Sequence, residues 1–209
     1  MTIDTILFDV GGVLITSLDP QTARTQRDRM ASELGFDSGD ALWLHFYDSD
    51  VWRECKTGRM VHEEMWDVLL RPYGFATRTE QAAFVAEFHG DEGLDPEMEQ
   101  LVARLHGQYR MGILSNWDDR LEMILAEQIG VDHYFDVIVN SHRIGAAKPE
   151  ESAFEIALER LGVRPEQVFF IDDQARNTRV AAAMGMETHT FESVEKLKDD
   201  LAGRGLLTP

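Results

Sequence analysis

The stretch that decides the fold lies near the N-terminus, where residues 6–14 read Ile6-Leu7-Phe8-Asp9-Val10-Gly11-Gly12-Val13-Leu14. A single carboxylate follows an apolar run and precedes two glycines. An uninterrupted apolar run bounded by glycine predicts a strand that is buried on both faces, as in parallel sheets. Ligands of such sheets bind beyond the carboxyl ends of the strands. Asp9 is therefore expected to point into a crevice, where a carboxylate suits the role of nucleophile or metal ligand.

The composition of the chain narrows the class of function. Its 209 residues, 44% of them apolar, are enough for a folded core. The formal net charge of −18 argues against nucleic acid or an anionic membrane as a partner. An anionic substrate is also repelled at long range, so a phosphate site has to be built locally from a metal ion, a lysine or backbone N–H groups.

The N-terminus and the cysteine content bear on location. Asp4 and Asp9 interrupt the first apolar run, which we therefore interpret as a strand and not as a signal peptide. No stretch is long enough to cross a membrane. Cys55 is the only cysteine, so an intrachain disulfide is excluded and a cytoplasmic location is expected.

The second half of the chain alternates between strand and helix patterns. Helices are predicted from Asp95-Pro96 to Gly107 and over 118–128, 149–161, 176–184 and 193–202, and strands over 4–10, 109–114, 135–139, 168–171 and 187–191. Such alternation predicts an α/β fold with a doubly wound parallel sheet, a Rossmann-like core with helices on both faces.

A helical block interrupts this pattern after the first strand. Residues 20–90 show helical spacing of apolar side chains and are divided by Gly35, Gly58 and Pro72-Tyr73-Gly74 into about four helices. The block leaves the sheet at the carboxyl end of the first strand, so we expect it to form a lid over the crevice. The sequence thus predicts a catalytic core of residues 1–15 and 93–209 and an α-helical cap domain of residues 16–92.

Four polar clusters stand at or just beyond predicted strand ends, namely Asp9, Ser115-Asn116, Lys148 and Asp172-Asp173. Each has a plain structural alternative: Ser115 can cap the following helix, Lys148 can be a surface lysine, and the two aspartates can be solvated turn residues. Their order at successive strand ends favours one shared site. Paired carboxylates suit Mg²⁺, a lysine and a hydroxyl suit phosphate oxygens, and a further carboxylate can attack phosphorus.

These four clusters resemble the motifs of the haloacid dehalogenase superfamily of hydrolases. The matching residues, in order, are Phe8 to Leu14, Ile113-Leu114-Ser115-Asn116, Lys148-Pro149, and Phe170-Ile171-Asp172-Asp173 with Asn177. The resemblance covers about 130 residues of core. The inserted helices resemble the small cap of the branch that contains sugar-phosphate phosphatases, phosphoglycolate phosphatases, the N-terminal phosphatase of epoxide hydrolases and 2-haloacid dehalogenases.

The resemblance implies a role for each matching residue. Asp9 is the nucleophile and a Mg²⁺ ligand, Gly11 offers a backbone carbonyl to the metal, and Asp173 is a carboxylate ligand. Asp172 either assists Asp173 or pairs with Lys148. Ser115 and the backbone of Asn116 bind phosphate, Lys148 steadies nucleophile and phosphate, and Asn177 orients the metal shell.

One position departs from the pattern of most phosphatases in the family. They carry a second aspartate two residues after the nucleophile, which protonates the leaving oxygen, and this chain has Gly11 there. General acid–base help is worth about 10²–10⁴ in rate. The departure predicts slow turnover, a substrate with a good leaving group such as an anomeric or acyl phosphate, or an acid supplied by the cap.

Residues outside the motifs carry weaker indications. Trp117 is expected either to line the substrate pocket or to pack in the core. Trp52, Arg53, Lys56 and Arg59 flank Thr57-Gly58, and this loop either reaches over the site or carries solvated charges. Cys55 has no activating neighbour in the sequence and is expected to be inert.

The sequence therefore predicts a Mg²⁺-dependent phosphatase, acting as a monomer or homodimer on a small phosphorylated metabolite through an aspartyl-phosphate. The resemblance leaves open a metal-free 2-haloacid dehalogenase, although dehalogenases typically have serines where this chain has Asp172-Asp173. A catalytically impaired relative that binds or regulates is a further alternative, motivated by Gly11. A phosphate-accepting signalling receiver fits less well, because receivers place their acid pair near the first strand.

Overall fold

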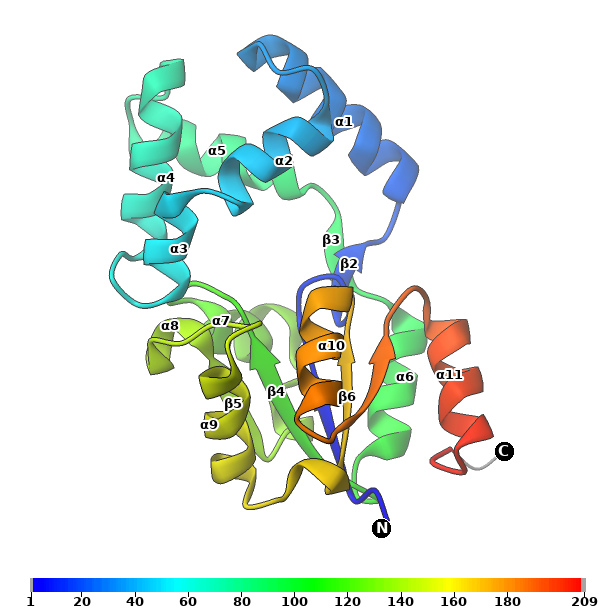
Figure 1. The fold of residues 1–209 in the computed structure, drawn as a ribbon. Coiled ribbons are helices and arrows are strands. Elements are labelled where there is room, and N and C mark those ends of the chain that lie inside the picture. The colour runs from blue at the N-terminus through cyan, green and yellow to red at the C-terminus, as the bar shows by residue number, and fades with distance from the viewer. Residues whose placement is uncertain (1, 208–209) are drawn as a thin grey trace.

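Strand β1, Thr5–Phe8, lies at the centre of a parallel sheet with the strand order β5-β4-β1-β6-β7. The computed structural model describes residues 2–207. The other strands of this sheet are β4 Arg110–Ser115, β5 Val137–Asn140, β6 Val168–Asp172 and β7 Glu187–Thr190. Helices cover both faces (Figure 1). The α/β fold predicted from strand–helix alternation is confirmed.

Side chains of β1 alternate between two apolar layers, as the period of a strand requires. Ile6 and Phe8 pack in one layer, which is covered by α6 (Pro96–Leu105) and α11 (Val194–Gly203). Leu7 faces the other layer, which is covered by α9 (Glu151–Leu161) and α10 (Ala175–Ala183). The central strand is therefore buried on both faces, and its end is held in place from two sides.

The helix predicted over residues 118–128 differs in the structure. It begins later, with the short α7 Leu121–Met123, and continues as a π-helical segment, η2 Ile124–Ile129. The reason lies in Asp118, whose carboxylate accepts hydrogen bonds from the backbone N–H of Arg120 and from His62 of the inserted block. An Asx-type turn of this kind competes with the start of a helix. Helix α8, Ser141–Ile144, was not predicted.

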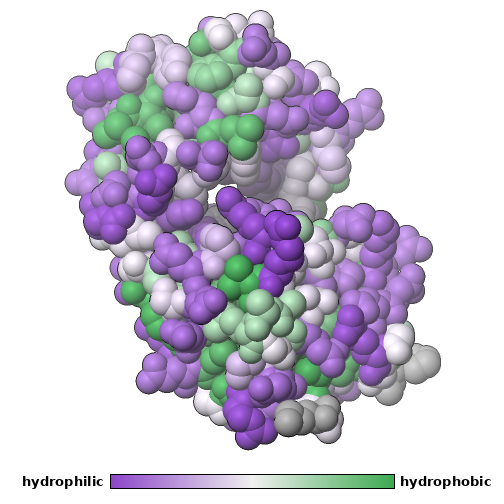
Figure 2. Space-filling model, in the orientation of Figure 1, coloured by the Kyte–Doolittle hydropathy of each residue, from purple (hydrophilic) through white to green (hydrophobic). Residues whose placement is uncertain are grey.

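The inserted block contains five α-helices and one 3₁₀ turn among the described residues, where about four helices were predicted. They are α1 Pro20–Leu34, α2 Gly39–Tyr47, α3 Asp50–Lys56, α4 His62–Leu70, η1 Arg71–Tyr73 and α5 Arg78–His89. These helices share an apolar core of their own that includes Phe46, Trp66, Phe84 and Phe88. We call this block the cap. It lies beyond the carboxyl ends of the strands (Figure 1), and the surface is hollowed between cap and sheet (Figure 2).

Two strands that the sequence did not reveal connect cap and core. Strand β2, Ile15–Ser17, pairs antiparallel with β3, Glu92–Leu94, and Asp91 accepts hydrogen bonds from the Ser17 hydroxyl and the Asp19 backbone. The predicted domain boundaries, after residues 15 and 92, fall inside this ribbon. Among residues 2–207, no helix is long and apolar enough to cross a membrane.

Candidate active site

Four of the predicted site residues meet at the carboxyl ends of β1, β4 and β6. The Ser115 hydroxyl donates a hydrogen bond to Asp9 Oδ1 at 2.8 Å. Lys148 Nζ lies 2.8 Å from Asp9 Oδ2 and 2.6 Å from Asp172 Oδ2. All four side chains are buried. The surface-lysine and solvated-turn alternatives are therefore wrong for Lys148 and Asp172, and Ser115 bonds a carboxylate instead of capping a helix.

Strand register explains why these residues meet. Phe8 stands opposite Ile113 on β4 and opposite Ile171 on β6. Parallel strands in this register end at nearly the same level, so Asp9 and Asp172, each following its apolar run, lie side by side. The four residues of β1 pair one to one with Val168–Ile171 of β6, and this pairing brings Asp9 close to Asp172, although the two residues are far apart in the chain.

Lys148 is held from both its backbone and its side chain. The Asn116 side-chain amide donates to the Lys148 carbonyl and accepts from its N–H, both at 2.8 Å. Burial alone lowers the pKa of Lys148, but the negative charges of Asp9 and Asp172 outweigh burial and keep its pKa above the ordinary value. Asn116 therefore positions Lys148 through its side-chain amide.

Three carboxylates form a cluster that fits a divalent cation. Asp9, Asp172 and Asp173 each offer one oxygen, and these oxygens lie within 4.8 Å of one another. Burial raises the pKa of Asp9 to about 7, because its effect outweighs the lowering by the Lys148 charge, and the charge of Asp172 adds to the rise. Asp173 is exposed as a residue, but partial burial of its carboxylate and then the charge of Asp172 raise its pKa to about 6. A bound cation would reduce the electrostatic repulsion between these neighbouring carboxylates.

The neighbours of this cluster fit a hydrated metal ion as well. Asn177 Nδ2 donates to both oxygens of Asp172, while its Oδ1 is buried and has no partner in the described residues. That oxygen can accept a hydrogen bond from a water on the metal. Of the two roles expected for Asp172, pairing with Lys148 is the one that these contacts favour, because both oxygens of Asp172 already accept hydrogen bonds.

The structure requires glycine at position 12 but not at position 11. Gly12 has a φ of +75°, and a Cβ there would lie 2.7 Å from Asp173 Oδ2, so a side chain would displace that carboxylate. Gly11 has no positive φ, and a Cβ there would lie at an ordinary 3.4 Å from the Trp117 ring. The indole therefore lies beside the position where most family phosphatases carry their general acid. Trp117 also packs against the apolar layer that contains Phe8, so the core packing expected for it is confirmed and the role in lining a substrate pocket stays a prediction.

The cap residues singled out in the sequence divide into two groups. Arg53 pairs with Asp50 and Arg59 with Glu54 at the surface, so these are solvated ion pairs. Trp52 packs on Tyr47 inside the cap.

Lys56 is half-buried and has no ion pair among residues 2–207. Burial, followed by the charge of Arg176 in the core, lowers the pKa of Lys56. Lys56 is therefore the member of this group with its charge free for an anion. Cys55 is buried, which raises its pKa to about 12 and fits an inert thiol.

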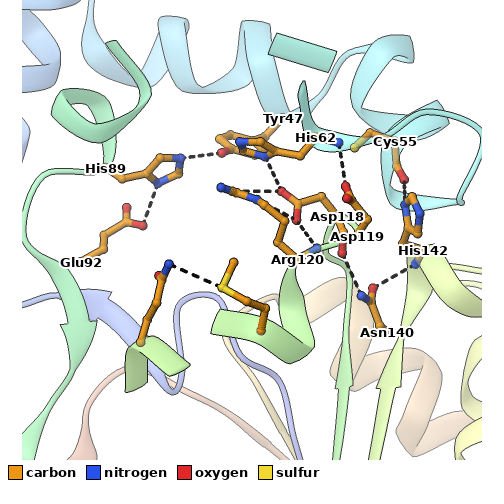
Figure 3. Close-up of polar contacts among 12 residues, drawn as sticks. Tyr47, Cys55, His62, His89, Glu92, Asp118, Asp119, Arg120, Asn140 and His142 are labelled. Atoms are coloured by element: carbon orange, nitrogen blue, oxygen red, sulfur yellow. Dashed lines mark hydrogen bonds and ion pairs between the residues drawn. The ribbon is translucent and has the colours of Figure 1, made fainter. Parts of the chain in front are cut away.

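Sequence reasoning missed a set of contacts between cap and core. His62 at the start of α4 contacts Asp118 and Asp119, and His142 contacts the carbonyl of Cys55 (Figure 3). The available signal was the second acid pair, Asp118-Asp119, placed directly after the Ser115 motif. It was interpreted as the start of a helix, whose partner across the fold cannot be read from spacing.

Fold and site together define an α/β enzyme whose polar centre lies at the ends of its central strands. The chain belongs to the haloacid dehalogenase-like hydrolase family, whose model matches residues 3–185. It is 28% identical to fructose-1-phosphate phosphatase YqaB of Escherichia coli over 87% of this chain and 93% of that protein. It spans only 6% of the mouse acyl-CoA dehydrogenase family member 10 and 37% of E. coli pyrimidine 5'-nucleotidase YjjG.

Solved structures of the family share the fold. A HAD family enzyme from Bacteroides thetaiotaomicron, in complex with magnesium and inorganic phosphate, superposes with a TM-score of 0.71 at 23% identity, covering 91% of this chain and 94% of that one. The L-2-haloacid dehalogenase from Xanthobacter autotrophicus gives a TM-score of 0.64 at 20% identity, covering 99% and 85%. The fold is thus shared both with a family member that binds magnesium and inorganic phosphate and with a 2-haloacid dehalogenase.

Replacement of the buried lysine tests the charge balance of the site. Lys148→Met leaves Asp9 and Asp172 without their shared cation, and the free energy of unfolding is expected to fall by about 3–5 kcal/mol. Urea denaturation at neutral pH without metal measures this. Lys196→Met is the matched control, because Lys196 pairs with Glu192 at the surface and its loss should cost less than about 1 kcal/mol. Equal small losses in both variants would contradict the account of Lys148.

Proposed function

We propose that this protein is a Mg²⁺-dependent phosphatase that hydrolyses a small phosphorylated metabolite through an aspartyl-phosphate on Asp9. The observation that carries the proposal is the environment of Asp9. Its carboxylate lies between a buried lysine at 2.8 Å, a serine hydroxyl at 2.8 Å and two further carboxylates suited to a cation. Phosphatases among the curated relatives, including fructose-1-phosphate phosphatase YqaB and phosphoglycolate phosphatase of Pseudomonas putida, support the same reaction type.

The residues divide the reaction into two steps. In the first, a carboxylate oxygen of Asp9 attacks phosphorus, and the bond between phosphorus and the leaving oxygen breaks. In the second, water attacks the phosphorus of the aspartyl-phosphate, which yields inorganic phosphate and free Asp9. Ser115, the Asn116 backbone and Lys148 hold the phosphate oxygens, and the ammonium group of Lys148 counters their charge in both steps.

The metal site of the proposal uses residues that are already close together. Asp9, Asp173 and the Gly11 carbonyl are the proposed ligands, with Asp172 and Asn177 supporting them. A Mg²⁺ ion bound there supplies charge stabilisation for the transferring phosphoryl oxygens. The solved Bacteroides relative that contains magnesium and inorganic phosphate supports this choice of ion. Trp117 and Lys56 are proposed to contact the part of the substrate beyond its phosphate.

Removal of the nucleophile tests the proposal. Asp9→Asn should lower kcat/KM for phosphate release by at least about 10³-fold, because the amide cannot form the covalent intermediate. Chelation should abolish wild-type activity, and added Mg²⁺ should restore it. Phosphate release from sugar phosphates and acyl phosphates, with and without EDTA, measures both effects. Asp37→Asn, which changes an exposed carboxylate in the cap, is the matched control and should behave as wild type.

The rival functions predict different results in the same assay. Halide release from a 2-haloacid that survives chelation would favour the dehalogenase, whose fold this chain shares. Failure of both wild type and Asp9→Asn on a broad panel of phosphate esters with Mg²⁺ would favour the impaired relative. In either case the phosphatase proposal would be overturned.

The Gly11–Trp117 arrangement predicts a strong dependence on the leaving group. Without an acid beside Asp9, acetyl phosphate and p-nitrophenyl phosphate should exceed glycerol phosphate in kcat/KM by about 10²–10⁴-fold. Gly11 has an ordinary backbone conformation, so Gly11→Asp can restore the acid and should raise activity on glycerol phosphate about tenfold or more.

Gly11→Asn is the matched control for this gain, because it has the same shape and no proton of suitable acidity. Gly11→Asn should leave the ratio of kcat/KM for activated phosphates to kcat/KM for alkyl phosphates unchanged. Wild-type enzyme that hydrolyses alkyl and acyl phosphates at similar rates would show that another group already supplies the proton.

A further inference from the structure

The start of helix α4 in the cap is only half capped from within the helix, by Glu64, which accepts a hydrogen bond from the Val61 N–H at 3.3 Å. The first N–H groups of a helix lack partners inside the helix and are usually satisfied by a polar side chain at the preceding position. That position is Val61, which has no acceptor atom. The missing acceptor comes from the core, because the His62 N–H donates to Asp119 Oδ1 at 2.7 Å across 57 positions of sequence.

A second carboxylate strengthens this contact. Asp118 Oδ2 lies 2.6 Å from His62 Nδ1, and both side chains are nearly buried. Burial raises the pKa of Asp118, but the hydrogen bond and charge of His62, together with Arg120, outweigh it and lower the pKa overall. Asp118 is thus held as a carboxylate at the positive end of the α4 dipole. Two adjacent acids of the core therefore fix one end of a cap helix.

The cap touches the core at a second point, beside the first. The His142 Nδ1–H donates to the carbonyl of Cys55 near the end of α3, at 2.8 Å. Gly58 makes the approach tight, since its φ is +78° and a Cβ there would lie 2.3 Å from the His142 carbonyl oxygen. Asn140 joins both points: its Nδ2 donates to the Asp118 carbonyl at 2.8 Å and its Oδ1 accepts from the His142 N–H at 3.0 Å (Figure 3). We call Asp118, Asp119, Asn140 and His142 the cap clamp.

Two residues of the cap clamp lie in the same loop as the predicted phosphate-binding residues. Ser115 and Asn116 are followed, after Trp117, by Asp118 and Asp119 in one short loop. The Trp117 N–H donates to the Ser141 hydroxyl at 3.1 Å, so this loop and the one after β5 are tied together. Closely packed loops with few alternative arrangements transmit a shift from one end to the other.

We infer that the cap clamp positions the cap over the active site and couples this position to phosphate binding, with Asp119 as its central positioning residue. The coupling rests on the proposed function, because it requires phosphate at Ser115 and Asn116. Phosphate that orders this loop would order Asp118 and Asp119 and thereby hold His62 and helix α4 in the closed position. A closed cap, in turn, would favour retention of the phosphate, since coupling between two sites is reciprocal.

Hydrogen exchange of the His62 amide, measured by NMR on the full chain, tests the clamp without any ligand. Asp119→Ala should speed this exchange about five- to tenfold, the effect of losing a helix cap. Asp119→Asn keeps an acceptor oxygen and should stay near wild type. Glu127→Ala is the matched control, because it removes an exposed carboxylate of η2 and should change nothing. Equal exchange in Asp119→Ala and Glu127→Ala would overturn the clamp.

Inorganic phosphate with Mg²⁺ tests the coupling. In wild type it should slow exchange of the His62 amide, and in Asp119→Ala this slowing should be lost while phosphate still binds in a direct titration. Slowing that is the same in both proteins would overturn the coupling. Phosphate that does not bind wild type at all would overturn the coupling together with the proposed function, whereas the ligand-free comparison judges the clamp separately.

Discussion

The ammonium group of Lys148 lies between two buried carboxylates, and the active site is organised around it. Asp9 and Asp172 end neighbouring parallel strands, and neither could be buried as an anion beside the other without a cation. Lys148 provides that cation while its own backbone is held by the Asn116 amide. All four motifs are therefore joined by charge and hydrogen bonding, and the Ser115 hydroxyl adds a hydrogen bond to the other oxygen of Asp9.

Asp9, the proposed nucleophile, is held firmly by this arrangement, whereas position 11 offers no acid to the leaving group of the proposed reaction. Gly12 must be glycine because the Asp173 carboxylate occupies the space of a side chain there. Gly11 is not forced in this way, and the Trp117 ring lies beside it. Under the proposed function, the site would bind a phosphoryl group and stabilise its charge, while Gly11 offers no side chain that could protonate the leaving oxygen. Chemistry of this kind suits a substrate whose leaving group departs without protonation.

Much of the core could be predicted from the sequence, because its strands are uninterrupted apolar runs that end in polar motifs. The positions of Asp9, Ser115 and Asp172 at one edge follow from the rule that parallel strands end together. Lys148 instead lies in the loop after α8, so the rule does not place it. Strands β2 and β3 were missed because three residues are too few to show a period, and Gly93 lacks a side chain. The cap contacts were missed for another reason. His62 and Asp118 are 56 positions apart, one in the cap and the other in the core, so neither residue signals the other in the sequence.

The most direct test of the central claim is mass spectrometry of the Asp9 peptide after acid quenching of the enzyme with acetyl phosphate and Mg²⁺. The account predicts a single phosphoryl group on Asp9 that hydroxylamine removes and that is missing in Asp9→Asn and in enzyme treated with EDTA. Phosphate release without any label on Asp9, or a label carried by another residue, would contradict it.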